Sequence, residues 1–266
     1  MTLWFVTPAW KRYEMTALCL EQRQRVIAEL AKHDIEAYQV VIADDENLDI
    51  ARALGCATVE RNNEMVGRKF NDGMEYAGTH GAEWIVPIGS DSWIDPAYFL
   101  DLPDLRYTRT STAYCTVTAD SLAELKVASG DYSAGPFVFH RRLLKHSGFR
   151  PSAEDSDMVD TSILKGIRKY AHTRRGLKLR WDMHTLHPFQ YIGFRVAPMM
   201  TSNEYLKRRW LVREHEPWTT LAKHYPLDLV LRAREIMQNE PTEPLAPSGL
   251  RPIRGQRRNR LVGRPG

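Results

Sequence analysis

The sequence predicts an α/β fold with a mostly parallel central sheet and helices on both of its faces. The apolar runs 3–6 and 37–43 have the length of buried strands, and an amphipathic stretch that ends near residue 32 lies between them. A strand, a helix and a second strand in this order form a βαβ unit, whose strands are parallel and whose crossover is right-handed. Both strands therefore end at the same edge of the sheet.

The next elements continue the alternation of helices and strands. They are a helix at 49–54, a strand at 57–60, a helix at 66–77 and a strand at 84–88. In the helix at 66–77 the apolar residues recur at helical spacing, so we expect Lys69 and Asp72 on its solvent side. Proline cannot donate to a strand ladder, so we place Pro87 at the end of its strand.

The second half of the chain is less regular. We expect strands at 113–118, 136–140 and 177–181, a helical turn at 141–146 and a helix at 158–171. Pro217 and Pro226 break the segment 210–239 into helical pieces. We divide the chain into a main domain at 1–205, a C-terminal helical extension at 206–240 and a tail at 241–266.

The tail differs in composition from the rest of the chain. Between residues 251 and 266 there are six arginines and no acids, among prolines and glycines, whereas the other residues together are close to neutral. Such a segment cannot bury enough apolar area to fold, so we predict that it is disordered. It is suited either to binding nucleic acid or another acidic surface, or only to aiding solubility.

Composition excludes several other classes of protein. A bilayer span takes about 20 apolar residues, no such run is present, and the N-terminus lacks a secretory signal pattern. The three cysteines are odd in number and far apart, which fits neither a disulfide framework nor a zinc site. We therefore expect a cytoplasmic globular protein.

Polar residues follow the predicted strands. Asp91 comes after the strand at 84–88, where a carboxylate either holds a divalent cation against a phosphate or caps a turn. Asp44 and Asp45 follow the second strand, and Arg12 and Lys69 are expected nearby. A glycine-rich dinucleotide fingerprint and a P-loop are both absent. The phosphates of a bound nucleotide would therefore be neutralised by a metal ion and by side chains.

Four segments together resemble nucleotide-sugar glycosyltransferases of the GT-A fold, of the family 2 type. They are Thr7-Pro8, residues 40–49, residues 67–73 and residues 88–96. The similarity covers about residues 3 to 165, and it extends to small glycosyltransferases encoded by bacteriophages.

The resemblance implies roles for the residues in these segments. Thr7, Pro8 and Asp45 would hold the nucleoside, and Asp91 would occupy the acidic D-x-D position that binds Mn²⁺ or Mg²⁺. With the nearby cations, the expected donor-binding set is Thr7, Pro8, Arg12, Asp45, Lys69, Asn71, Ser90 and Asp91. Gly89 stands where the family has its first acid, so metal binding would depend on one carboxylate and on further ligands.

His184 and His187 are the candidates for those further metal ligands. Both follow the last predicted strand of the main domain, where some GT-A enzymes supply a late ligand. A histidine, one carboxylate and two phosphate oxygens would suit manganese. The alternative for each residue is a hydrogen-bonded structural histidine.

The resemblance also implies an acceptor base. In family 2 enzymes this carboxylate lies in an acidic loop at the start of a helix, after a Gly-Phe turn. Here residues 148–149 precede Glu154, Asp155, Asp157 and Asp160. Alignment on the following helix favours Asp160 and the end of the loop favours Asp157, so both are kept. The remaining acids would complement the helix dipole.

We therefore predict a hexosyl-transferring glycosyltransferase that uses a UDP- or GDP-sugar, Mn²⁺ or Mg²⁺, and a protein or glycan acceptor. Two alternatives stay open. A sugar-phosphate nucleotidyltransferase shares the architecture, but its glycine-rich basic loop after the first strand is missing from residues 7–12. A degenerate GT-A domain would act only as a binding module, with nucleic acid held by the tail.

Overall fold

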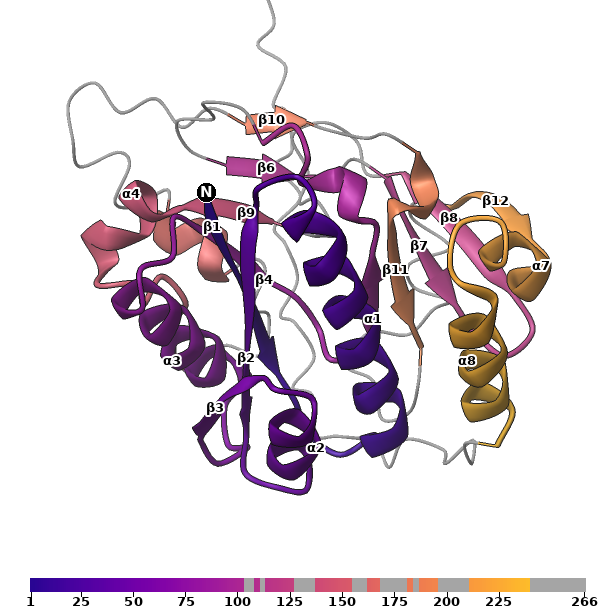
Figure 1. Ribbon diagram of the computed structural model, residues 1–266, viewed down its shortest axis with the longest axis horizontal. Coiled ribbons are helices and arrows are strands. Elements are labelled where there is room, and N and C mark those ends of the chain that lie inside the picture. The colour runs from indigo at the N-terminus through magenta and orange to yellow at the C-terminus, as the bar shows by residue number, and fades with distance from the viewer. Residues whose placement is uncertain are drawn as a thin grey trace, which may run out of the picture.

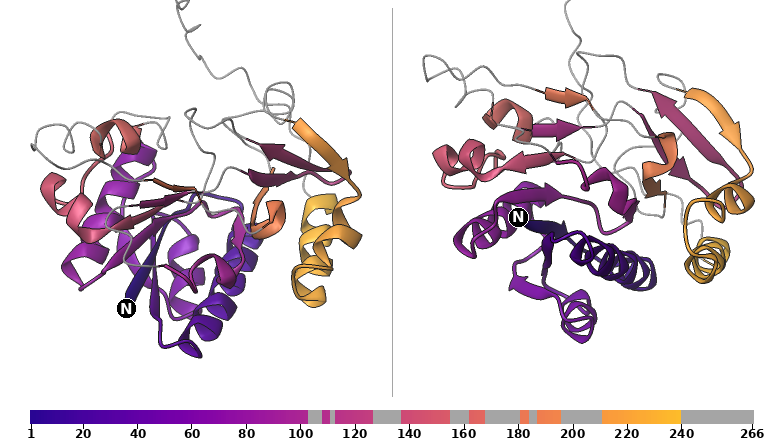
Figure 2. Two further views of the ribbon diagram at one scale, coloured as in Figure 1. Left: turned by 90° about the horizontal axis from the view of Figure 1, so that it is seen from above. Right: turned by 45° about the horizontal axis from the view of Figure 1, so that its top comes forward.

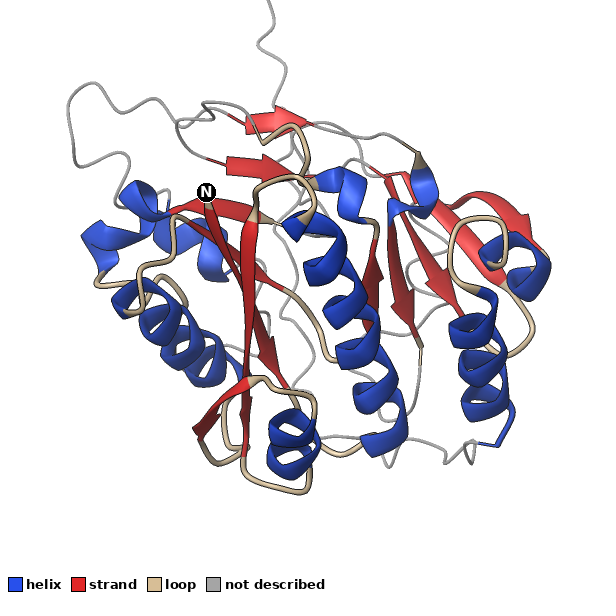
Figure 3. Ribbon diagram, in the orientation of Figure 1, coloured by secondary structure: helices blue, strands red, loops and turns tan. Residues whose placement is uncertain are grey.

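Two sheets flanked by helices make up the computed structural model (Figure 1, Figure 3). It describes residues 1–102, 108–110, 113–126, 137–154, 162–167, 181–183, 187–195 and 211–239. In order across the larger sheet, the strands are β10 (Trp181–Met183), β6 (Thr108–Thr110), β9 (Val138–His140), β4 (Trp84–Pro87), β1 (Thr2–Pro8), β2 (Glu36–Ala43) and β3 (Ala57–Glu60).

The centre of the larger sheet is parallel. β1 pairs with β2 on one side and with β4 on the other, and β2 pairs with β3. β9 runs antiparallel to both β4 and β6. The order of the strands along the chain reverses between β1 and β4, which makes this gap the switch point where ligands bind in open α/β sheets.

Helices cover both faces of the parallel strands. α1 (Tyr13–Ala31) and α2 (Asn47–Ala53) cover one face, and α3 (Val66–Thr79) covers the other. Side chains of β1 alternate between the faces, with Phe5 in the α1 cluster and Val6 in the α3 cluster. Gly73 lets α3 approach closely, since a Cβ there would lie 2.5 Å from Val6 Cγ1.

The smaller sheet lies on the side of α1 away from β2 and β3 (Figure 1, Figure 2). Its strands, in order, are β12 (Leu211–His215), β8 (Leu122–Lys126), β7 (Ala113–Val117), β11 (Tyr191–Phe194) and β5 (Ser92–Ile94). The helices α7 (Pro217–Leu221) and α8 (Leu227–Asn239) pack with this sheet and with α1 around one apolar cluster. The shorter helices are η1 (Pro96–Tyr98), α4 (Arg141–Leu144), η2 (Lys145–Ser147) and η3 (Pro188–Gln190).

The predicted α/β fold is confirmed, and the first half follows the predicted order of elements. In the second half, residues 162–167 are helical and contribute Ile163, Leu164 and Ile167 to the core, as expected. Of the strand predicted at 177–181, only its last residue is described, at the start of β10. The basic tail lies outside the described residues. Among the described residues, none of the helices combines the length and the apolarity needed to cross a bilayer.

Two expectations were wrong, and several short strands were not predicted. Residues 211–215 form β12 and not a helix, so the segment predicted as a helical extension begins with a strand that completes the smaller sheet. The short strands β5, β6, β8 and β11 were not predicted, because runs of three to five residues are too short to show a clear alternation in polarity. Lys69 and Asp72 are only 1% and 8% exposed, because the Lys69 side chain reaches Ala9 O beyond the end of β1 and Asp72 pairs with Arg150 of the loop at 150–154.

Candidate functional site

The predicted donor residues gather where β1, β2 and β4 end. Thr7 and Pro8 close β1, Asp45 follows β2, and Ser90 and Asp91 follow β4. The register of the parallel pairs brings these ends to one edge of the sheet. The site therefore lies at the switch point between β1 and β4, as the pattern of strand ends predicts.

Arg12 joins two of these strand ends. Its Nη1 donates to Asp91 Oδ2 at 2.8 Å, and its Nη2 donates to Ser90 Oγ at 3.4 Å. The side chains of Arg12 and Asp91 are 18% and 17% exposed, so the pair lies at the rim of the sheet, in partial contact with solvent. An ion pair that is partly desolvated holds its geometry better than one on the open surface.

The β1 loop, residues 9–12, has a strained backbone. Lys11 and Arg12 have φ of 52° and 50°, in the left-handed region that side chains disfavour. Asp45 fixes the loop by accepting from Lys11 N at 2.9 Å, and Asn47 Nδ2 donates to Lys11 O at 3.2 Å. The half-exposed Asp45 carboxylate also accepts hydrogen bonds from Asn47. Asp45 therefore holds the β1 loop in place and is also a candidate contact for the nucleoside.

Arg23 lies beneath the site with no exposed surface. Its Nη1 donates to Thr7 Oγ1 at 2.5 Å, and its Nη2 donates to Gly89 O at 2.7 Å. Longer contacts reach Gln39 Oε1 and Ser92 O. All of these acceptors are neutral, and burial lowers the pKa of the guanidinium. Thr7 is itself fully buried, so its hydroxyl supports the floor of the site.

Lys69 is a second buried cation. Its Nζ donates to Ala9 O at 2.8 Å and lies 3.8 Å from Asp44 Oδ1. Burial lowers the pKa of Lys69, and the charges of Asp44 and Asp45 oppose that shift. Lys69 therefore holds the β1 loop from below.

The carboxylates do not form a metal site among the described residues. Asp91 is the one acid at the end of β4, and its oxygens already accept from Arg12 Nη1 and, at 3.2 Å, from Ser92 Oγ. A side chain at Gly89 would place Cβ 2.6 Å from Asp91 Oδ1, so an acid at this position would require the Asp91 carboxylate to move. No cluster of three or more His, Cys, Asp or Glu within the described ranges is arranged for a metal ion. The residues that are described do not fit the predicted Mn²⁺ or Mg²⁺.

The two histidines add no described ligand to Asp91. His187 Nε2 lies 3.3 Å from Asp95 Oδ2, and its ring stacks on His224 with centroids 5.1 Å apart. The described contacts of His187 therefore include Asp95 and His224 but not Asp91. His184 lies outside the described residues.

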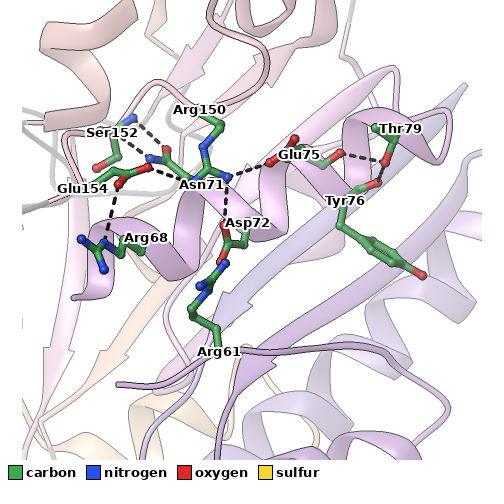
Figure 4. Close-up of polar contacts among 10 residues, drawn as sticks. All are labelled: Arg61, Arg68, Asn71, Asp72, Glu75, Tyr76, Thr79, Arg150, Ser152 and Glu154. Carbon is green, nitrogen blue, oxygen red and sulfur yellow. Dashed lines mark hydrogen bonds and ion pairs between the residues drawn. The ribbon is translucent and has the colours of Figure 1, made fainter. Parts of the chain in front are cut away.

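A polar cluster, here named the α3 clamp, joins α3 to the segment that leads into the acidic loop (Figure 4). Asn71 Nδ2 donates to Ser152 O at 2.9 Å, and Ser152 N donates to Asn71 Oδ1 at 3.0 Å. Arg150 donates to Asp72, Glu75 and Glu154 at 2.7 to 2.9 Å. Arg61 also donates to Asp72. The amide nitrogen and the amide oxygen of Asn71 are thus both used within the clamp. None of these contacts involves the donor end of β1.

The clamp removes one candidate base. Glu154 accepts from Arg150 and lies 3.6 Å from Arg68, and these cations hold it in ion pairs on the α3 side. Asp157 and Asp160, the two residues favoured as the base, lie outside the described residues, as does Asp155.

Comparisons with known proteins bear on the fold. No protein-family model matches the sequence, and no curated protein matches it at a significant level. Staphylococcus aureus TarS, residues 1–349 in complex with UDP, matches the structure with a TM-score of 0.50 and 16% identity, over 74% of this chain and 61% of that chain. This chain thus spans about three fifths of the TarS chain.

Two further solved structures have lower scores. A mutant of the Drosophila β-1,4-galactosyltransferase 7 with manganese, UDP-Gal and xylobiose has a TM-score of 0.49 at 8% identity, over 84% of this chain and 79% of that one. A CMP:2-keto-3-deoxy-manno-octonic acid synthetase with CTP has a TM-score of 0.42 at 12% identity, over 78% and 96%. The likeness to TarS establishes the fold, which is the GT-A fold that the sequence predicted.

The residue that sequence reasoning missed is Arg23. A signal for it was present, because Arg23 recurs at helical spacing with Cys19, Val26 and Leu30 on the apolar face of α1. A cation on the apolar face of a helix is buried when that face packs against the sheet. A buried cation needs hydrogen-bond acceptors.

Proposed function

We propose that this protein transfers a sugar from a nucleoside diphosphate sugar to an acceptor hydroxyl. The observation that carries the proposal is the convergence of Arg12, Arg23 and Lys69 at the carboxyl end of β1, at the switch point of a GT-A fold. Fixed cations at a strand end suit an anionic diphosphate, and they stabilise the charge that develops as it leaves.

The proposed roles follow from accessibility. Pro8 and Asp45 are half-exposed at the ends of β1 and β2, so we assign them to the nucleoside. Arg12, at the rim of the switch point, is assigned to the diphosphate, and Asp91 is assigned to orienting Arg12. Thr7, Lys69 and Ser90 are buried and bonded to backbone or side chains, so their part is to hold the site in shape. Asn71 is buried in the α3 clamp, so its part is to hold the segment that leads to the acidic loop.

The chemistry requires one bond to break and one to form. The bond between the anomeric carbon and the diphosphate oxygen breaks, and its electron pair leaves with the diphosphate. The acceptor oxygen forms the new bond to the anomeric carbon and gives its proton to a carboxylate. We assign that carboxylate to Asp157 or Asp160.

The test is hydrolysis of a panel of UDP- and GDP-sugars, with and without Mn²⁺. The measured quantity is the nucleoside diphosphate that is released. Hydrolysis of at least one donor is expected, since water can replace an absent acceptor. Asp45→Ala should weaken nucleotide binding by about 1 to 3 kcal/mol, the cost of an unmatched hydrogen bond. Asp49→Ala is the matched control, because the Asp49 side chain is 81% exposed on α2 and pairs with Arg52.

Two outcomes would contradict the proposal. Pyrophosphate release from a nucleoside triphosphate and a sugar phosphate, without donor hydrolysis, would identify a nucleotidyltransferase. Nucleotide binding without turnover of any donor would identify a binding module.

A further inference from the structure

We propose that Arg12 takes the place of a divalent cation at the donor diphosphate, and that the site binds and cleaves its donor without a metal ion. This inference rests on the proposed function. Four features of the described residues support it.

The first feature is the position of the Arg12 guanidinium. It is held between Asp91 and Ser90, at the end of β4, where the resemblance would place the metal. A guanidinium has five N–H donors, and the contacts of Arg12 use one donor on each of its Nη atoms. The remaining donors have the fork geometry that binds phosphate oxygens in pairs.

The second feature is the strained backbone of the β1 loop, which orients Arg12. Two successive residues with positive φ, Lys11 and Arg12, persist only where the surroundings over-determine the backbone. Asp45 and Asn47 hold this loop from the side, and Lys69 holds it from below. Strain of this kind gathers at ligand-binding sites, and here its result is to turn Arg12 toward Asp91.

The third feature is the shape around Asp91. Its carboxylate folds back over Gly89, within 2.6 Å of where a Cβ would lie. A second acid at position 89 would displace it, and a metal ion on Asp91 would have to compete with the Arg12 ion pair. Asp91 is therefore a positioning residue that holds Arg12 in place.

The fourth feature is the charge below the site. Arg23 is fully buried, and its hydrogen bonds go to the neutral groups of Thr7, Gly89, Gln39 and Ser92. Its charge is therefore not cancelled by a bonded carboxylate. In a medium of low dielectric constant, such a charge attracts an anion more strongly than a solvated one does. Arg12 and Arg23 together supply the positive field that a divalent ion would otherwise provide.

The step that Arg12 assists is the departure of the diphosphate. As the bond to the anomeric carbon breaks, the electron pair moves onto the diphosphate oxygen. The Arg12 N–H groups donate hydrogen bonds to that growing charge. Arginine stays protonated throughout, so no proton is transferred to the leaving group.

The experiment uses the full chain and calorimetric titration of UDP, GDP and the matching monophosphates, first in EDTA and then in Mn²⁺. A diphosphate is expected to bind in EDTA, with an affinity that Mn²⁺ changes by less than about threefold. Arg12→Met should weaken diphosphate binding by about 10- to 100-fold, the range for a hydrogen bond to a charged group, and leave the monophosphate nearly unchanged. Arg25→Met is the control, since Arg25 is an arginine of α1 whose side chain is 42% exposed and pairs with Asp228.

A second pair of variants tests the part assigned to Asp91. Asp91→Asn keeps an acceptor for Arg12 and should retain most of the diphosphate affinity, whereas Asp91→Ala should lose it. Loss in both variants, together with a Mn²⁺ requirement in the wild type, would show that Asp91 is a metal ligand.

Donor hydrolysis separates the two proposals. Hydrolysis that EDTA abolishes and Mn²⁺ restores overturns this inference and leaves the proposed function standing. Absence of both diphosphate binding and hydrolysis, in either buffer, overturns both. Hydrolysis in EDTA that falls with Arg12→Met supports both.

Discussion

The buried cations at the donor end of β1 and the cations of the α3 clamp are held in opposite ways. At β1, Arg23 is fully buried and bonds to neutral groups, and Lys69 bonds to a carbonyl with a carboxylate only at 3.8 Å. In the α3 clamp, the 31% exposed Arg150 side chain bonds to three carboxylates (Figure 4). A cation surrounded by carboxylates is neutralised and fastens segments together. A cation bonded to neutral groups keeps its field, at a cost of desolvation.

The difference explains why the two regions suit different tasks. The end of β1 holds positive charge in a fixed place before any ligand binds, which is the arrangement that favours an anion. The α3 clamp attaches the segment 150–154 to the first half of the chain. That segment leads in sequence to Asp157 and Asp160, so the clamp sets where the acidic loop begins.

The largest expected effect comes from removing the buried cation of the donor end. Arg23→Met should lower the free energy of unfolding by about 3 to 5 kcal/mol, because Thr7 Oγ1 and the Gly89 carbonyl lose their donor while they remain buried. Urea denaturation measures this loss.

A matched variant lies on the same helix. The Arg25 side chain is 42% exposed, and it pairs with Asp228 and Glu21. Arg25→Met should cost less than about 1 kcal/mol, as exposed ion pairs do. Equal losses in the two variants would contradict the distinction between neutral-bonded and carboxylate-paired cations.

The next largest effect concerns the hydrogen bonds between the Asn71 side chain and the Ser152 backbone in the α3 clamp. Asn71→Ala removes two buried hydrogen bonds to the Ser152 backbone, and it should cost about 2 to 3 kcal/mol by urea denaturation. Thr79→Ala is the control on the same helix, because the exposed Thr79 hydroxyl bonds to carbonyls one turn earlier and to the ring of the adjacent His80.

Salt separates the two kinds of contact within the clamp. The loss in Asn71→Ala should be the same at low and high ionic strength, because no charge is removed. The smaller loss in Arg150→Met should shrink as salt screens its carboxylate contacts. A salt-dependent loss in Asn71→Ala would mean that the amide contacts act through the neighbouring charges.

The same comparison shows what the sequence was able to predict. Strand ends can be read from local patterns, so the placement of Pro8, Asp45 and Asp91 at one edge followed from the alternation of apolar runs. The α3 clamp joins positions 71 and 152, which no local pattern relates. Asp72 is buried through its contact with Arg150, and Lys69 through its bond to Ala9 O. Both contacts are long-range, so a helical pattern alone assigned the two residues to solvent. Likewise β12 exists because it pairs with β8, and its residues are mostly exposed.

The smallest expected effect concerns a polar group that folding keeps neutral. His140 Nδ1 accepts from Arg142 N at 3.2 Å and caps α4, and its ring meets Trp84 edge to face with centroids 4.9 Å apart. Burial lowers the pKa of His140, the Glu83 charge opposes this shift, and Arg141 and Arg142 add to it. Protonation would also remove the acceptor that caps the helix.

The sign of the pH dependence follows from that direction. The unfolded chain takes up the proton near the ordinary pKa of histidine, about 6.5, whereas the folded protein takes it up only at lower pH. The contribution of His140 to stability is therefore complete above that value and is lost as the pH falls through it toward the folded pKa. His140→Asn keeps a capping oxygen that does not titrate. The difference in unfolding free energy between wild type and variant should change by about 1 kcal/mol or less as the pH is lowered, in favour of the variant. A difference that stays constant over this pH range, in urea denaturation series run side by side, would show that His140 binds its proton equally in both states.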